Sequence, residues 1–200
     1  DRASELAGRT VHPNDHVNAC QSSNDVVPSA LRLFVAMCLR DRTLPALDQL
    51  AGSLRALAAR HAATVTLGRT HLMDATPVLL GDVVGGWAAQ LDEARAPLER
   101  AMIAATAVPL GGSAVGSGLN VPDGWAEAVA RELATRTGAP VRLVPDRFAA
   151  MSGGELYSTV SGGLRTAAGT LTKLAEDLRG LAAGPIGGPG EVVLPTVAAG

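Results

Sequence analysis

One short segment, residues 68–74 (GRTHLMD), carries the side chains best suited to acid–base chemistry in this 200-residue sequence. Histidine is the side chain that most readily transfers protons near neutral pH, and His71 directly follows Arg69 and Thr70. Arg69 can bind a substrate carboxylate or pair with Asp74. A structural histidine would explain the same residues, so this segment alone predicts only a candidate site.

A second segment, residues 21–25 (QSSND), has the residue types of an anion site. The hydroxyls of Ser22 and Ser23 and the amide of Asn24 precede a helical pattern. Free backbone N–H groups and the helix dipole favour an anion at such a start. Plain N-capping by Asn24 or Asp25 explains the same residues, so both interpretations stay open.

The third segment is a glycine-rich loop at residues 111–120 (GGSAVGSGLN). Its backbone amides can line a pocket for an anion. No predicted strand precedes it and no lysine follows it, so it does not match a nucleotide-binding loop. A flexible connection between two helices is an equally good interpretation.

A metal site is the weaker interpretation of His12, Asp15 and His16. Pro13 disrupts any helical register there, and no cysteine or second histidine cluster lies nearby in sequence. A solvated polar turn explains these residues, and we therefore expect no metal.

Two cysteines, Cys20 and Cys38, are too few for a disulfide framework and favour a reducing compartment. We interpret both as small packing residues. Glu155 and Glu191 have no partner that can be identified from sequence spacing.

Between these loops, apolar residues recur at spacings of three and four, which predicts amphipathic helices. We expect helical structure over 25–182 and loops over 1–24 and 184–200. Helices should start near Asn24 or Asp25, near Thr43 and at Thr76-Pro77, and Pro97 should kink or shorten one of them. Further helices are expected at about 123–137 and 146–182. Extended structure is expected only at 64–67 and 141–144.

The last predicted helix contains an unusual number of glycines, each of which costs about 1 kcal/mol relative to alanine inside a helix. Close approach of neighbouring helices would compensate for that cost. The glycines concerned are Gly153, Gly154, Gly162, Gly163 and Gly169.

Composition agrees with an all-α fold of long antiparallel helices. Hydrophobic residues make up 47% of the chain but aromatic residues only 2%, beside 23 glycines. The formal net charge is -2 without a basic block, which disfavours nucleic acid as a partner. No apolar run approaches the roughly 20 residues of a membrane helix. We therefore expect a cytoplasmic protein without a membrane partner.

Four segments together carry a family resemblance. VHPNDHVNACQSSND at 11–25, GRTHLMDATP at 68–77, GGSAVGSGLN at 111–120 and GEVVLPTVAAG at 190–200 resemble, in order, the motifs of class II fumarases in the fumarase/aspartase superfamily. The resemblance implies that residues 1–200 are the central helical-bundle domain, truncated at both ends. It also implies that this domain contributes to a tetrameric helical core.

The resemblance implies roles for the candidate residues. The family adds water or an amine reversibly across fumarate-like double bonds through an aci-carboxylate dianion. Thr70 and His71 would be active-site residues, with His71 in acid–base or leaving-group chemistry. Ser22, Ser23 and Asn24 would bind the substrate carboxylates.

A second anion site is implied at His12, Asn14 and Asp15. The implied substrate pair is fumarate and malate, and we expect neither cofactor nor metal. The expected assembly is a homotetramer with active sites shared between subunits. The family's serine loop, GSSxMPxKxNP, would begin at Gly200.

Two alternatives stay open. Aspartate ammonia-lyases and other dicarboxylate lyases belong to the same superfamily, although aspartases usually carry Gln where this chain has His71. Ala19, Cys20 and Met73 also depart from the common fumarase pattern. An alternative of another class is a non-catalytic helical oligomerisation module.

Overall fold

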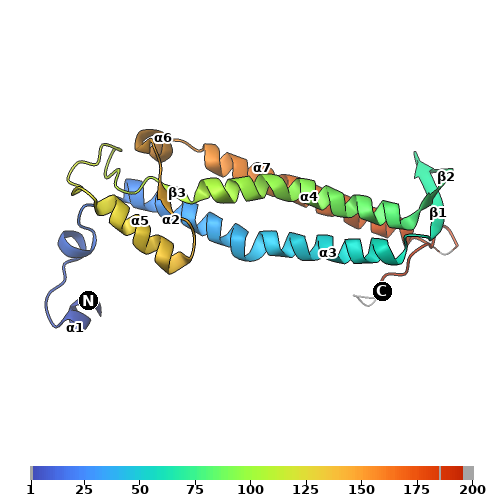
Figure 1. The fold of residues 1–200 in the computed structure, drawn as a ribbon, viewed down its shortest axis with the longest axis horizontal. Helices are drawn as coiled ribbons and strands as arrows, with labels where there is room; N and C mark the ends of the chain where they lie inside the picture. The colour runs from blue at the N-terminus through green and yellow to red at the C-terminus, as the bar shows by residue number, and fades with distance from the viewer. Residues whose placement is uncertain (1, 185, 196–200) are drawn as a thin grey trace. The chain divides into compact units, whose positions relative to one another are not determined.

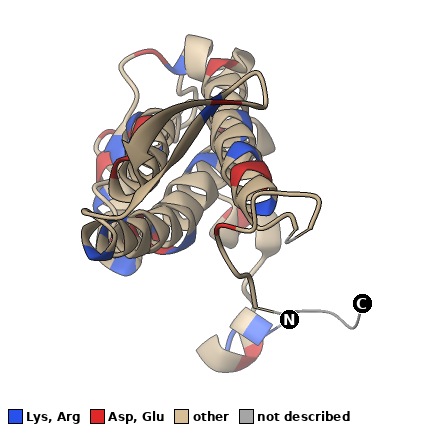
Figure 2. Ribbon diagram, turned by 90° about the vertical axis from the view of Figure 1, so that its right-hand side faces the viewer, with Lys and Arg blue, Asp and Glu red and all other residues tan. Residues whose placement is uncertain are grey.

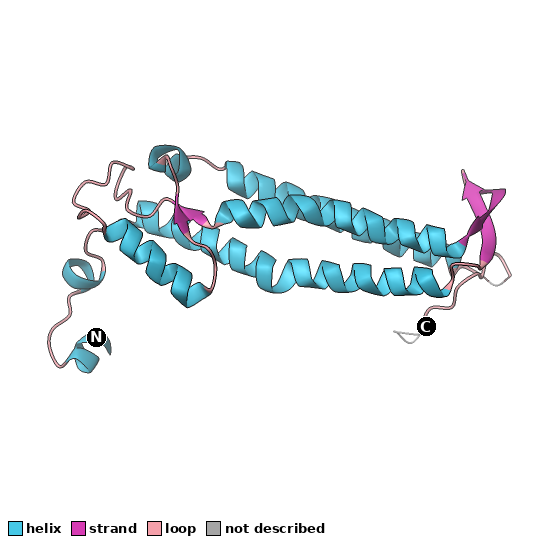
Figure 3. Ribbon diagram, viewed as in Figure 1, coloured by secondary structure: helices cyan, strands magenta, loops and turns pink. Residues whose placement is uncertain are grey.

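The computed structural model describes residues 2–184 and 186–195, and most of them are helical (Figure 3). The helical elements are α1 (Arg2–Ala7), the π-helical turn η1 (Pro13–Val17), α2 (Ser23–Cys38), the π-helical turn η2 (Leu39–Thr43), α3 (Leu44–Arg60), α4 (Leu80–Ala105), α5 (Trp125–Thr137), α6 (Arg147–Ser152) and α7 (Glu155–Leu181). The strands are β1 (Val65–Thr70), β2 (Met73–Leu79), β3 (Ala107–Val108) and β4 (Arg142–Leu143). None of the helices in the described ranges combines the length and apolarity needed to cross a bilayer.

The chain divides into two compact units. Unit 1 comprises Asp1–Thr43 and Glu99–Thr159, and unit 2 comprises Leu44–Leu98 and Val160–Gly200. The expected all-α class is confirmed, because both units consist mainly of helices and the strands are short. That residues 1–200 form one central domain stays a prediction.

Unit 2 is an antiparallel bundle of α3 with the parts of α4 and α7 that belong to it (Figure 1). Polar contacts join its helices at their edges. Arg95 pairs with Asp48 at 2.7 Å between α4 and α3, and the Trp87 indole N–H donates to Asp177 of α7 at 2.9 Å. Leu91 and Leu98 of α4 are almost completely buried, at 1% and 0% exposure.

Basic and acidic residues are interspersed along the ribbon, as the blue and red segments of Figure 2 show. Several form ion pairs within unit 2, including Arg55 with Asp92 and Lys173 with Asp177. This interspersed pattern is the one expected from the balanced composition.

Strands β1 and β2 form an antiparallel hairpin between α3 and α4. The register changes between Leu67 and Arg69, so Gly68 occupies a bulge. A Cβ there would lie 2.9 Å from the carbonyl oxygen of Thr76, which explains the glycine. The predicted helix start at Thr76-Pro77 is wrong, because these residues belong to β2 and α4 begins at Leu80.

Unit 1 is built around a small apolar core of Leu33, Val108 and Leu110. Half-buried side chains from α2, α5 and β4 pack against it, and β3 pairs with β4 in parallel. The predicted helix at 123–137 and the extended residues near 141–144 are confirmed within about two residues. This core places the N-terminus of α2 beside the glycine-rich loop.

Several predicted boundaries need correction. The expected loop at 1–24 contains α1 and η1, and α2 is capped by Ser22 rather than by Asn24 or Asp25. The single stretch at 146–182 is interrupted between α6 and α7. Pro97 does not shorten its helix, because α4 continues to Ala105.

Close helix approach explains only part of the glycine pattern in α7. A Cβ on Gly163 would lie 2.8 Å from Leu98 Cδ2, so a side chain there would meet α4. A Cβ on Gly162 or Gly169 would meet no neighbouring atom within 4 Å. Gly153 and Gly154 lie in the break before α7 and are not inside a helix.

Gly81 is a position in α4 where a side chain should be poorly tolerated. A Cβ would meet the Ala58 carbonyl oxygen at 2.7 Å and the Ala62 Cα at 2.8 Å, both of which are backbone atoms. We expect Gly81→Ala to lower the free energy of unfolding by about 1–3 kcal/mol. The matched control is Gly86→Ala, where no atom lies within 4 Å and a gain of roughly 0.5–1 kcal/mol is expected. Chemical denaturation at fixed protein concentration measures both, and equal effects would contradict the expectation.

Candidate active site

The segment at residues 21–25 forms a capping box at the start of α2. The Ser22 hydroxyl oxygen accepts the Asn24 N–H at 3.1 Å, and the Asp25 Oδ1 accepts the Ser22 N–H at 3.0 Å. Two of the backbone donors that a helix start leaves unpaired are thereby satisfied. The local capping interpretation is therefore correct, although the capping residue is Ser22.

Asp25 also binds the glycine-rich loop. Its Oδ2 accepts the N–H groups of Gly111 and Ser113, both at 3.0 Å, and its residue exposure is 0%. The Asn24 side-chain amide adds a bond to the Ala114 carbonyl at 2.8 Å. The loop amides that seemed available for an anion are thus partly used by a carboxylate of the protein itself.

Polar groups remain available at this helix start. Ser22 uses its oxygen as an acceptor, so its O–H is free to donate. Ser23 and Asn24 are exposed. Together with the positive end of the α2 dipole, these groups can bind a carboxylate.

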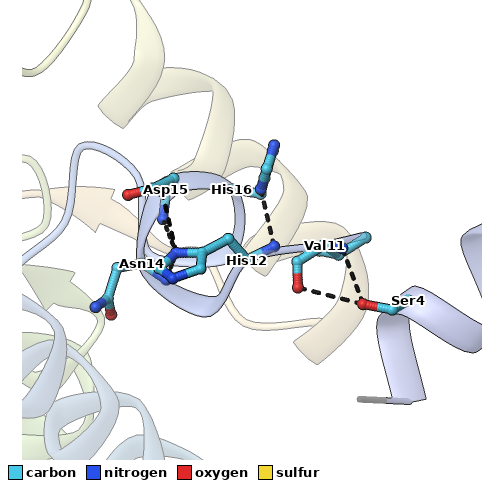
Figure 4. A network of polar contacts seen from close by, with 6 residues as sticks. All are labelled: Ser4, Val11, His12, Asn14, Asp15 and His16. Carbon is cyan, nitrogen blue, oxygen red and sulfur yellow. Dashed lines mark hydrogen bonds and ion pairs between the residues drawn. The ribbon is translucent and has the colours of Figure 1, made fainter. Parts of the chain in front are cut away.

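The His12 ring caps the turn η1 (Figure 4). Its Nδ1 accepts the N–H groups of Asn14 and Asp15 at 3.3 and 3.2 Å, while the His12 N–H donates to His16 Nδ1 at 2.9 Å. Nδ1 also lies 3.2 Å from the Asp15 carboxylate, a contact that needs a proton on Nδ1. One nitrogen cannot accept and donate at once. When Nδ1 accepts the two backbone bonds, the proton of a neutral imidazole is on Nε2, which can then donate.

The β1–β2 hairpin ends in a two-residue turn formed by His71 and Leu72. Both have left-handed φ angles, 53° and 61°, as a type I′ turn requires. Such angles are uncommon outside Gly, Asn, Asp and His, so Leu72 is the more strained of the two residues. Thr70 and His71 are exposed at this tip, and among the described residues neither side chain has a hydrogen-bond partner.

Glu191 binds strand β1 of the hairpin. The Thr66 hydroxyl and the Arg69 guanidinium each donate to its carboxylate at 2.8 Å, while Asp74 lies farther from Arg69, at 3.6 Å. Burial raises the pKa of Glu191, but the hydrogen bonds from Arg69 and Thr66 and the charge of Arg69 outweigh it, so the net shift is downward. The sequence left a substrate carboxylate or Asp74 open as the partner of Arg69. The structure contains the ion pair with Asp74 and adds the shorter one with Glu191, for which sequence spacing gave no partner.

The candidate residues fall into two groups. Within unit 1 the structure brings Asn24 and Asp25 to the glycine-rich loop, and Ser22 is bonded to both of them. Within unit 2 it joins the hairpin that carries Thr70 and His71 to the segment around Glu191. Gly200, where the serine loop would begin, lies outside the described residues.

The described residues contain no group of three or more His, Cys, Asp or Glu side chains placed to hold a metal ion. Cys20 and Cys38 are both free thiols. The hydrogen bonds of His12, Asp15 and His16 explain their clustering without a metal.

Comparisons with known proteins give consistent results. The family described as "Lyase" matches residues 2–200. Fumarate hydratase class II of Pseudomonas syringae pv. tomato is 48% identical over 200 residues, which cover 97% of this chain and 43% of the relative. The Thermus thermophilus protein of the same name is 44% identical, and the match covers 98% of this chain and 43% of that relative. A crystal structure of recombinant class II fumarase from Schistosoma mansoni matches with a TM-score of 0.95 at 34% identity, covering 100% of this chain and 46% of that one.

The chain thus spans less than half the length of the curated relatives it matches. Within that span, the family matches residues 2–200 and the fold match covers the whole chain. On this evidence the chain belongs to the lyase family, beside the class II fumarate hydratases.

Proposed function

We propose that the complete protein is an enzyme, a fumarate hydratase that interconverts fumarate and malate. The observation that carries the proposal is the hairpin tip, where a strained two-residue turn exposes Thr70 and His71 without partners in the described chain. Strained backbone of this kind concentrates at functional sites. The similarity to class II fumarate hydratases supports the same reaction.

In the dehydration direction, a base removes a proton from the malate carbon beside one carboxylate, giving an aci-carboxylate dianion. The hydroxyl on the neighbouring carbon then leaves as water after receiving a proton from a general acid. We assign His71 to this acid–base or leaving-group step and Thr70 to binding the reacting groups. By the resemblance, the carbon base is a serine of the loop predicted to begin at Gly200.

The substrate carboxylates are assigned to the start of α2. The free O–H of Ser22, the exposed hydroxyl of Ser23 and the exposed amide of Asn24 would donate there. Fixed donors of this kind also stabilise the extra charge of the dianion. His12, Asn14 and Asp15 are assigned to a second anion site, and no cofactor or metal is required.

We further propose that residues 1–200 form the central domain of a cytoplasmic homotetramer whose active sites are shared between subunits. One face of α2 supports this assembly, because Val27, Leu31 and Phe34 recur at helical spacing and are 52%, 49% and 64% exposed. Such an apolar stripe is typical of an interface. Light scattering of the complete protein tests it, and a monomer would contradict it.

The activity is tested with the complete protein by following fumarate formation from malate and ammonia release from aspartate. We expect turnover of malate and none of aspartate. Turnover of aspartate alone would establish the ammonia-lyase alternative. Neither activity, in a well-folded oligomer, would favour the non-catalytic oligomerisation module.

A further inference from the structure

The carboxylate of Glu191 joins two segments that are far apart in sequence. Its two oxygens are used separately: Oε2 accepts the Thr66 O–H and Oε1 accepts an Arg69 N–H, both at 2.8 Å. The sequence separations are 125 and 122 residues. The link therefore connects strand β1 to the chain that follows α7.

The backbone beside Glu191 is held as firmly as its side chain. The Glu191 N–H donates to the Leu181 carbonyl at 2.9 Å, and the Gly190 N–H donates to the Ala183 carbonyl at 2.8 Å. The C-terminal end of α7 is thereby paired with residues 190–191. Since Glu191 is fixed to α7 on one side and to β1 on the other, it fastens the hairpin to the end of the bundle.

The hairpin needs such an anchor. It has only two strands, most of its residues are exposed, and an isolated pair of strands is marginally stable in water. The ion pair of Arg69 and Glu191 is sheltered, with side-chain exposures of 27% and 21%, unlike the open surface pairs on the helices. Solvent therefore screens it less than those pairs.

We propose that Glu191 is a positioning residue for the acid–base group of this enzyme. It holds β1 through Thr66 and Arg69 and so fixes the tip where Thr70 and His71 follow directly. The inference rests on the proposed function, because it assigns Glu191 an effect on the step performed by His71.

The first test is Glu191→Gln in the complete protein. The amide keeps the shape but loses the charge and one acceptor oxygen. We expect kcat to fall about 10- to 100-fold, since a displacement of about 1 Å at a reacting group can cost 10²-fold. KM should change less than about threefold, because the start of α2 is untouched. The control is Glu176→Gln, which removes an exposed pair with Arg179 and should leave kcat and KM unchanged.

A second pair of variants avoids any change of charge. Thr66→Val removes the hydroxyl and should lower kcat in the same direction, whereas Thr66→Ser keeps the hydroxyl and should retain the normal rate. The double variant Glu191→Gln/His71→Asn should be no slower than His71→Asn alone, because Glu191 acts through the imidazole. Fully additive losses would overturn the inference and indicate a general loss of structure.

Hydrogen exchange separates failure of the inference from failure of the proposed function. Amides of residues 65–79 should exchange faster in Glu191→Gln than in the Glu176→Gln control. If the unaltered enzyme hydrates fumarate and Glu191→Gln keeps its full kcat, the positioning role is wrong and the function stands. If the unaltered protein has no hydratase activity, the proposed function is wrong and the catalytic role falls with it. In that case the exchange data still decide whether Glu191 anchors the hairpin.

Discussion

Replacing His71 with asparagine in the complete protein should lower kcat for malate dehydration by about 10²-fold or more, the usual contribution of a general acid or base. Asparagine is the suitable replacement because position 71 has a φ of 53°, and asparagine tolerates the left-handed region better than other residues with a side chain. The turn is thereby kept while the imidazole is removed. Steady-state kinetics measures the loss, and we expect KM to change little.

The matched control is His61→Asn at the end of α3. The His61 ring lies 3.3 Å from the Thr64 hydroxyl and has no assigned role in the reaction. We expect normal kinetics from this variant. A near-normal rate in His71→Asn would show that His71 is structural and would remove the central residue from the proposed mechanism.

The second large effect is expected at Asp25, on stability rather than rate. In the native protein, one Asp25 oxygen accepts the Ser22 N–H and the other accepts the N–H groups of Gly111 and Ser113. Asp25→Asn replaces one of these two oxygens with an amide N–H₂, whichever way the amide is turned. At least one buried donor loses its acceptor and faces another donor. We expect the free energy of unfolding to fall by about 2–4 kcal/mol, because bonds to a charged group are worth about 1.5–3 kcal/mol and an orphaned buried donor costs a similar amount.

Asp146→Asn is the control for this substitution. Asp146 caps α6 by accepting the single N–H of Ala149 at 3.0 Å, and asparagine serves equally well at such a position. Denaturant titration at fixed protein concentration should show little change for this variant. An equally small change in Asp25→Asn would mean that the loop at 111–120 does not depend on the carboxylate.

The hairpin could not be predicted well from the sequence, for identifiable reasons. A two-residue turn is usually signalled by Asn-Gly or Asp-Gly, and here the turn residues are His71 and Leu72. β2 is almost entirely exposed and β1 is about half exposed, so neither has a buried face that would require a regular alternation of apolar and polar residues. Pro77 resembled the first turn of a helix, although it lies in β2.

The helices were predicted because their cause is local. The observed starts of α2, α3 and α5 lie within about two residues of the expected positions. The observed N-cap of α2, Ser22, precedes the predicted one by two or three residues. Ser22, Asn24 and Asp25 are all suitable caps by residue type. Only backbone geometry distinguishes among them.

The sequence alone determined the helical class, the positions of most helices and the segments that carry the candidate chemistry. These features depend on residues three or four apart, which a linear pattern records. Tertiary structure decided which polar groups meet. Asp25 accepts a hydrogen bond from Gly111 across 86 positions, and Arg69 donates to Glu191 across 122 positions while it also pairs with the nearby Asp74. The partners in these pairings are far apart in sequence, so no local pattern predicts them. They meet because the packing of helices and loops brings distant donors to each carboxylate.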